Sequence, residues 1–335
     1  MEVQSLSICV PTHNQCVNKC EFCVSRTHTN PYEDRINNVV KTSKISIPTS
    51  ISGTDNFIDE SKDYFNRLRY ARDNGCDVVL TGTDESIEKT IEYKDYFNRL
   101  QYARDNGCNV VVLTGTGEPI QNPDFLDFFS KINNTLQTPF KSIELQTTGV
   151  MLNDQILAHL RNIGITTISF SISNIFDNDR NLNLIGCAEK LKFNVFETIK
   201  LVKKYDFNLR LSLNLVNDYD SVTVYNVIER CKELGADQVT FRKLYKSELN
   251  NDIDKWIENN ASVDFYDRLV TYVEEKGNFL GYLPFGPKIY DIDEMSVCID
   301  SDCMSEEIKN TFKYLILREN AKLYTRWDKK SSLIF

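Results

Sequence analysis

The stretch KDYFNRLQYARDNGCNVVVLTGTGEP, residues 94–119, contains the pattern that decides the fold. Its first half has the apolar spacing of an amphipathic helix, and Gly107 supplies a helix stop. The apolar run at 110–114 is short and rich in valine, as a buried strand is. Helix, turn and buried strand together make one unit of a parallel α/β sheet.

The same alternation continues through most of the chain. It predicts a parallel sheet with right-handed crossovers. Six such units would curve into a partial (β/α)6 TIM-like barrel, in which the chemistry collects at the carboxyl ends of the strands. The predicted strands are 5–10, 110–114, 143–147, 166–172, 209–215 and 238–243, and the predicted helices are 94–106, 123–136, 153–162, 194–205 and 221–234.

The helix–turn–strand unit occurs twice. KDYFNRLRYARDNGC (62–76) recurs as KDYFNRLQYARDNGC (94–108), with a single difference. Near-identity of this kind indicates one internal tandem duplication, because solenoid repeats diverge and number three or more. Only the second copy ends in GTGEP. We therefore expect 94–119 to occupy the barrel slot and about 50–93 to form an insertion.

The chain changes character near residue 246. The strand–helix alternation stops there, and more irregular segments follow. We expect residues 1–245 to form the barrel and 246–335 to form a C-terminal extension that closes its open side. The segments of the extension are a polar stretch at 247–264, a helical pattern at 264–276, a Gly/Pro loop at 277–287 and strand-like runs at 314–318 and 322–327.

The composition is that of a globular protein, with 41% hydrophobic and 26% charged residues. A net charge of -9 argues against a general nucleic-acid or anionic-membrane surface. The N-terminal MEVQSLSICVPTHN lacks the basic and apolar parts of a signal peptide, and no run has the length of a membrane span. The 10 cysteines are too sparse for a disulfide scaffold and indicate thiols or metal ligands. We expect a cytoplasmic protein without membrane or nucleic-acid partners.

Three cysteines follow the first predicted strand in the run CVNKCEFC, residues 16–23, which we call the cysteine loop. The C-x3-C-x2-C spacing places Cys16, Cys20 and Cys23 on one compact loop. Three thiolates can hold three corners of a [4Fe–4S] cluster and leave the fourth iron open to bind a ligand. The alternative is a structural zinc loop with His13 as fourth ligand.

A second candidate feature is the Gly-rich turn after the strand at 110–114. Such a turn brings backbone groups close to a ligand, and Glu118 can accept a hydrogen bond from a cationic amine. Alone, a GTGEP turn is most often only a turn. Polar residues also interrupt the later apolar runs, and burying them is costly unless they find partners. They therefore either line the barrel mouth or pair in its wall.

The cysteine loop and the GTGEP turn together resemble the signature of the radical S-adenosylmethionine (radical SAM) enzymes, over about residues 5–245. The resemblance implies that Cys16, Cys20 and Cys23 hold a [4Fe–4S] cluster whose open iron chelates SAM. It also implies that the turn binds the SAM amino group, with Thr116 in place of a usual glycine. The implied cofactor contacts are Phe22, Gly115, Thr116, Gly117, Glu118, Pro119, Thr147, Ser171, Asn214 and Arg242.

In that family, one electron from the reduced cluster breaks the S–C5′ bond of SAM. The 5′-deoxyadenosyl radical then abstracts a hydrogen from the substrate, so the first step implies no catalytic side chain. The usual electron donor is a flavodoxin or ferredoxin. We expect an unidentified peptide or small metabolite as substrate.

Other possibilities stay open. A viperin-like nucleotide-modifying enzyme is the alternative subclass. Cys298 and Cys303 are too few for an auxiliary cluster, and could contact the substrate or donate a hydrogen atom. A non-catalytic, zinc-stabilised binding module is the alternative class. A degenerate family member, whose SAM site the duplication has disturbed, is a third possibility.

Overall fold

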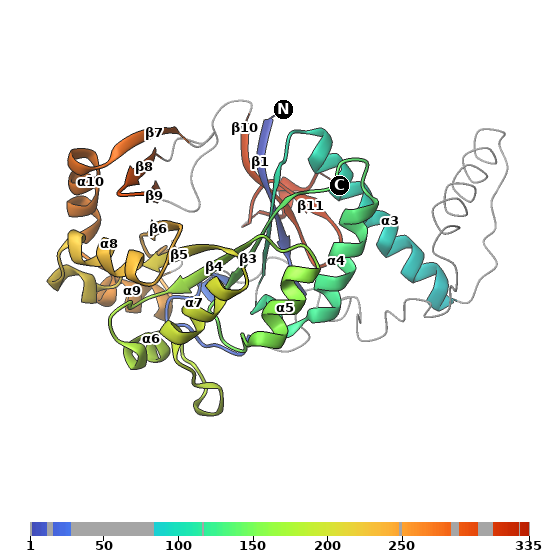
Figure 1. Ribbon diagram of the computed structural model, residues 1–335. Helices are drawn as coiled ribbons and strands as arrows, with labels where there is room; N and C mark the ends of the chain where they lie inside the picture. The colour runs from blue at the N-terminus through green and yellow to red at the C-terminus, as the bar shows by residue number, and fades with distance from the viewer. Residues whose placement is uncertain are drawn as a thin grey trace.

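The computed structural model describes residues 2–11, 16–27, 84–115, 117–247, 250–282, 288–300, 311–327 and 329–334 (Figure 1). The first copy of the repeat up to residue 83 lies outside these ranges. So do His13, Thr116 and Cys303, and the predictions that fall on them stay predictions.

The described strands are β1 (Glu2–Cys9), β2 (Val110–Thr114), β3 (Ser142–Thr147), β4 (Thr167–Ile172), β5 (Asn208–Asn214), β6 (Gln238–Arg242), β7 (Asn278–Tyr282), β8 (Lys288–Ile292), β9 (Met295–Asp300), β10 (Thr311–Leu317) and β11 (Leu323–Tyr324). They form one sheet in the order β11-β10-β1-β2-β3-β4-β5-β6-β9-β8-β7. Strands β1 to β6 are parallel neighbours in chain order. The predicted α/β fold with a mostly parallel, open sheet is therefore confirmed.

The described helices are α1 (Val24–Thr27), α3 (Asp84–Asp105), α4 (Pro123–Thr135), α5 (Asp154–Asn162), α6 (Asn178–Leu184), α7 (Val195–Lys204), α8 (Val224–Glu233), α9 (Asp252–Asn260) and α10 (Phe265–Lys276). In Figure 1, α3, α4, α5 and α7 lie beside one another along the strands. This is the arrangement that right-handed crossovers between parallel strands produce.

The sheet has one apolar face and one polar face. Along β6, Val239 and Phe241 are fully buried, whereas Thr240 and Arg242 are only half-buried. Successive side chains of a strand point to opposite faces, so the apolar set packs under the helices. The polar side chains, such as Thr240 and Arg242, lie on the other face of the sheet, which forms a polar wall that is partly open to solvent. Ser171, Asn214 and Arg242 belong to this polar wall, whereas Thr147 lies on the same face of β3 as the buried Ile143 and Leu145.

The second copy of the repeat fills the slot we expected. Its strand is β2, paired in parallel with β1 on one side and β3 on the other. Its helix is α3, which buries Tyr96, Leu100 and Ala103. The helix begins at Asp84, ten residues before the predicted start at 94.

Two segments of the extension differ from the prediction. Helix α9 lies in the stretch 247–264, which we expected to be merely polar. It is short, and its start is fixed by a capping box of Asn251 and Asp254 rather than by a long apolar pattern. Strand β7 lies in the predicted loop 277–287, where its mostly exposed side chains give no burial signal. Its backbone pairs with β8 instead.

The extension adds strands to both edges of the six-strand core. Strand β9 is parallel to β6, and β10 is parallel to β1. In the described chain, β9 and β10 do not pair with each other. The extension thus lengthens the sheet at both edges, and the expectation that it closes the open side stays a prediction.

Candidate active site

The cysteine loop is seated on the end of helix α6. The Lys19 N–H donates to the Ile185 carbonyl at 3.1 Å, and the Glu21 N–H donates to the Leu184 carbonyl at 3.3 Å. At Gly186, a Cβ atom would lie 2.6 Å from the Lys19 carbonyl oxygen. A larger residue at 186 would therefore push the loop away. These contacts give the three cysteines a fixed platform.

The thiols of the loop share one electrostatic environment. Burial raises the pKa of Cys16, and raises the pKa of Cys20 to about 12, with a further rise from the negative charges of Cys23 and Cys16. Three neighbouring thiolates therefore need a cation to remain ionised. Among the described residues, no three His, Cys, Asp or Glu side chains are arranged around a single metal ion. The donor set itself fits an iron–sulfur cluster, which thiolates hold.

The Gly-rich turn lies directly against the backbone that leaves β1. A Cβ atom at Gly115 would lie 2.8 Å from the Val10 carbonyl oxygen, so only glycine allows this approach. The Gln121 Oε1 atom then accepts from the Val17 N–H and from the Glu118 N–H, each at 3.2 Å. One side chain thus joins the cysteine loop to the turn, and the structure brings together the two motifs that the sequence singled out.

Glu118 is the buried acid of the site, only 3% exposed. Its Oε2 atom accepts from the Thr148 N–H at 3.0 Å and from the Thr148 hydroxyl at 2.9 Å. Its Oε1 atom has no hydrogen-bond partner in the described part of the chain. Burial raises the pKa of Glu118, and hydrogen bonds from Thr147 and Thr148 oppose that rise. A buried carboxylate with one unpartnered oxygen suits a cationic ligand.

The turn after β3 supplies more to the site than its sequence suggested. Thr147, the predicted contact, hydrogen bonds with Glu118. The neighbouring Thr148, which we did not single out as a contact, also holds Glu118 and receives a hydrogen bond from Asn18 Nδ2 at 2.8 Å. Gly149 adopts φ +84°, and a Cβ there would lie 1.8 Å from the Phe170 ring. Glycine is therefore required for the turn to place Thr148.

Three of the predicted strand residues form a second group. Asn214 Nδ2 donates to Ser171 Oγ at 3.2 Å and to Ser173 Oγ at 3.3 Å. Arg242 is the register partner of Asn214 on the next strand. The group therefore lies at the carboxyl ends of β4, β5 and β6. The predicted contacts of the Gly-rich turn also include Gly117, which is half-buried, and Pro119, which is buried.

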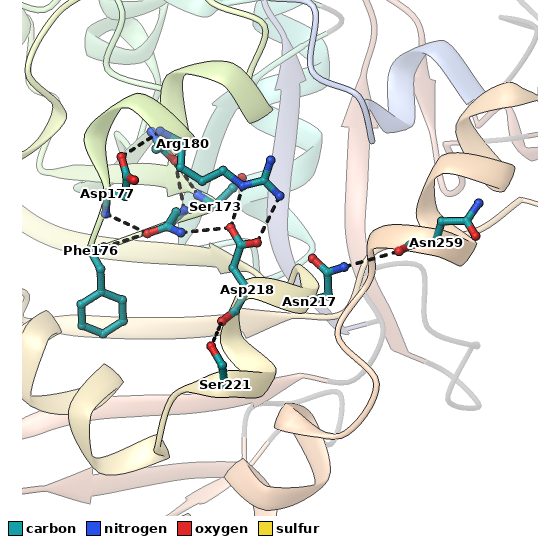
Figure 2. Close-up of polar contacts among 10 residues, drawn as sticks. Ser173, Phe176, Asp177, Arg180, Asn217, Asp218, Ser221 and Asn259 are labelled. Carbon is teal, nitrogen blue, oxygen red and sulfur yellow. Dashed lines mark hydrogen bonds and ion pairs between the residues drawn. The ribbon is translucent and has the colours of Figure 1, made fainter.

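An ion pair joins helix α6 to the segment after β5 (Figure 2). Arg180 donates to both oxygens of Asp218, from Nε at 2.8 Å and from Nη2 at 3.1 Å. Asn174 Nδ2 donates to Asp218 Oδ2 at 3.0 Å. The Arg180 guanidinium holds the pKa of Asp218 below its usual range. Sequence patterns gave no signal for this pair, because α6 was not predicted.

Phe22, on the cysteine loop, contacts the extension. Its ring packs against Trp256 of α9, with centroids 5.9 Å apart and planes tilted by 38°. Helix α9 therefore contacts the cysteine loop.

Cys298 is buried on β9 opposite Thr240 of β6. Among the described residues, no helix is long and apolar enough to cross a membrane.

The chain resembles known proteins in fold and in family. The solved structure of SuiB from Streptococcus suis bound to S-adenosylmethionine is 13% identical, with a TM-score of 0.52, and the match covers 96% of this chain and 60% of SuiB. SuiB bound to its precursor peptide SuiA gives 13% identity and a TM-score of 0.51, covering 96% of this chain and 59% of SuiB. The chain thus spans about 60% of the length of SuiB.

A search of curated protein sequences finds no significant match. At 13% identity, the likeness to SuiB shows the fold alone. The family itself rests on the sequence model of the radical SAM superfamily, which matches residues 10–218 and so covers more than half of the chain. This protein belongs to the radical SAM superfamily.

Proposed function

We propose that this enzyme uses a [4Fe–4S] cluster to cleave SAM reductively and to remove a hydrogen atom from a substrate. One observation carries the proposal. The buried Glu118, with an unpartnered oxygen, is joined to the cysteine loop through Thr148 and Asn18 and through Gln121. The metal-binding and amine-binding features that this chemistry requires are therefore held in one hydrogen-bonded unit.

The residues present fit both cofactors. Cys16, Cys20 and Cys23 would hold three irons, and the cluster would supply the electron and an open iron for SAM. Gly115, Gly117 and Pro119 would shape the turn that presents Glu118 to the SAM amino group, and we propose Thr116 as a further contact. Thr147 supports the carboxylate by its hydrogen bond.

The remaining predicted contacts would orient the rest of SAM. Ser171, Asn214 and Arg242 lie at adjacent strand ends and offer hydrogen-bonding groups for the ribose and carboxylate. Phe22 would cover the adenine, with Trp256 packed behind it. The packed helices on the other face of the sheet keep water from that side. No side chain of this chain is assigned as an acid or base.

We propose a peptide or small metabolite as the substrate. The peptide is favoured because SuiB, which shares the fold, has been solved with a precursor peptide. A viperin-like nucleotide substrate remains the alternative. We further propose residues 1–245 as the barrel, 246–335 as the extension, a cytoplasmic location and electron transfer from a flavodoxin or ferredoxin.

Anaerobic reconstitution with iron and sulfide tests the proposal. The reconstituted wild type should be brown and should form 5′-deoxyadenosine when it is reduced in the presence of SAM. Cys20→Ala should lose both properties. The matched control is Cys187→Ala, because Cys187 is also half-buried but lies outside the cysteine loop.

Three outcomes separate the alternatives. A colourless protein with bound zinc would favour the non-catalytic binding module. A brown protein that binds SAM but leaves it intact would favour a degenerate site. Loss of cluster and 5′-deoxyadenosine in Cys187→Ala as well as in Cys20→Ala would contradict the assignment of the ligands.

A further inference from the structure

The third cysteine of the cysteine loop contacts a serine two residues further along the chain. Cys23 Sγ and Ser25 Oγ lie 2.9 Å apart, which is hydrogen-bonding distance. Two consecutive turns bring these atoms together. The Cys23 N–H donates to the Cys20 carbonyl at 3.3 Å, and the Arg26 N–H donates to the Cys23 carbonyl at 3.0 Å. The backbone therefore curls around Cys23 and holds the Ser25 hydroxyl against the sulfur.

Metal binding fixes the direction of this hydrogen bond. In the free protein, either the thiol or the hydroxyl can donate its hydrogen. A cysteine binds a metal as a thiolate, which has no hydrogen to give. With a cluster in place, Ser25 must therefore donate and Cys23 must accept. A hydrogen bond to such a charged acceptor is stronger than one between neutral groups.

The first cysteine of the loop is arranged differently. The sulfur of Cys16 receives hydrogen bonds from the backbone N–H groups of Asn18 and Glu118. In the part of the chain that the structure describes, Ser25 is the side chain whose hydroxyl reaches a sulfur of the loop. Almost every residue type supplies a backbone N–H, whereas a hydroxyl depends on the residue at that position. The contact at Cys23 is therefore a specific property of this sequence, and a substitution can remove it.

Hydrogen bonds to the sulfurs are one of the features that set the reduction potential of an iron–sulfur cluster. An added electron increases the negative charge on those sulfurs, so a donor stabilises the reduced cluster more than the oxidised one. Resting on the function proposed above, we propose that Ser25 is a positioning residue that acts through Cys23. Its hydroxyl raises the reduction potential of the cluster on the cysteine loop. The external reductant supplies one electron, and the Ser25 proton stays on its oxygen.

Redox titration of the reconstituted full-length enzyme, without SAM, tests this role apart from turnover. Dithionite and redox mediators set the potential, and electron paramagnetic resonance measures the reduced cluster. At a given potential, Ser25→Ala should lower the ratio of reduced to oxidised cluster by about fivefold, a part of what a hydrogen bond to a charged group contributes. That ratio corresponds to a midpoint potential about 40 mV lower, at ~59 mV per tenfold change. Ser25→Thr keeps the hydroxyl and should change the ratio less than about twofold.

Ser221→Ala is the matched control. Ser221 is also exposed, and its hydroxyl also donates a hydrogen bond, to the Asp218 carbonyl at 3.1 Å, but it lies after β5. This variant should keep the wild-type midpoint. An unchanged midpoint in Ser25→Ala would mean that water replaces the hydroxyl at this exposed position, and would overturn the proposal. An equal lowering in Ser25→Thr and Ser25→Ala would also overturn it.

If Ser25→Ala takes up no cluster, Ser25→Gly decides, because it also lacks the hydroxyl and should show the same lowered midpoint. Loss of the cluster in both variants would assign Ser25 to cluster assembly rather than to the potential, and would overturn the proposal. A wild type that takes up no iron, or binds zinc instead, would contradict the proposed function itself.

Discussion

Two polar groups near the carboxyl ends of the strands differ in how completely their hydrogen-bonding atoms are paired. The Asn18–Thr148–Glu118 group leaves two buried acceptors without donors in the described chain. In the Asn174–Arg180–Asp218 group, both carboxylate oxygens accept from Arg180, and the Asn174 oxygen accepts from two backbone N–H groups (Figure 2). The first group has unmet acceptors in the described chain, whereas the carboxylate of the second is fully paired. Unmet hydrogen-bonding capacity, rather than polarity, distinguishes the proposed binding region from its surroundings.

The largest expected effect comes from Glu118→Gln. We expect SAM binding to weaken by about 100-fold, since a neutral amide replaces the charged acceptor of a hydrogen bond from the SAM amino group. The melting temperature should stay the same or rise, because a buried carboxylate without a full set of partners is costly. Equilibrium dialysis and thermal unfolding measure the two quantities.

The duplication offers a matched control for that change. Glu85 holds the same position in the first copy as Glu118 in the second. Glu85→Gln should leave SAM binding at the wild-type value. A Glu118→Gln protein with a lower melting temperature and normal SAM binding would contradict this expectation. It would show that Glu118 has a structural role rather than a ligand-binding one.

The next largest effect is expected for a substitution of Gly149, whose backbone conformation positions Thr148. Gly149→Ala should lower the free energy of unfolding by about 2–3 kcal/mol, because the new methyl group overpacks the site and the positive φ disfavours alanine. Urea unfolding measures the loss. Adding Phe170→Leu removes the ring that a Cβ would meet and should restore part of the stability. No recovery in the double variant would mean that the strain lies in the backbone alone.

A smaller effect is expected for substitutions in the Asn174–Arg180–Asp218 group. Asp218→Asn should lower the free energy of unfolding by about 1 kcal/mol, the upper range for a partly exposed ion pair. SAM affinity should change less than threefold, about the 0.6 kcal/mol that slight repositioning of neighbouring groups would cost. Arg180→Met should give the same loss, and the double variant should lose little more, because both changes remove one interaction. A large drop in SAM affinity would instead place Asp218 among the ligand contacts.

The same pair predicts a pH dependence. Because Arg180 lowers the pKa of Asp218 in the folded protein, the stabilisation is fully present above about pH 4, the ordinary aspartate pKa. It is lost as the pH falls through the lowered pKa. The stability difference between wild type and Asp218→Asn should therefore shrink on acidification. A difference that grows below pH 4 would contradict the direction of the shift.

The smallest expected effect is at the aromatic contact between the cysteine loop and α9. Trp256→Leu should lower the free energy of unfolding by about 0.5–1 kcal/mol, the value of one aromatic pair. Amide hydrogen exchange should become faster at Phe22 and its neighbours. Unchanged exchange there would show that the α6 platform alone holds the loop.

The long helices and strands with a clear hydrophobic period were predictable from the sequence, whereas the contacts between loops were not. Strand β2 has the predicted bounds, because a buried apolar run between a glycine-ended helix and a Gly-rich turn is unambiguous. The proximity of the cysteine loop to Glu118 followed from their positions after adjacent parallel strands. Thr148 escaped notice, because which of two adjacent threonines faces Glu118 depends on the turn at Gly149.

The Arg180–Asp218 pair escaped prediction for a related reason. Arg180 lies on α6, a short helix without a long apolar pattern, and Asp218 lies in a loop after another strand. Their contact arises only once β4 and β5 are neighbours. Helix α9 and strand β7 were missed because capping and backbone pairing, rather than buried apolar periods, define them.

The pairing of β1 with β10 has a consequence for biosynthesis. Ser5 lies opposite Tyr314, so two segments that are far apart in the sequence must meet before the strand that precedes the cysteine loop has both neighbours. Contacts with such long sequence separation form late, since the entropy of closing the loop is paid before the contact is made. The N-terminal strand therefore emerges from the ribosome long before its final neighbour. The thiols of the cysteine loop are therefore synthesised long before the strand that pairs with β1 beside them.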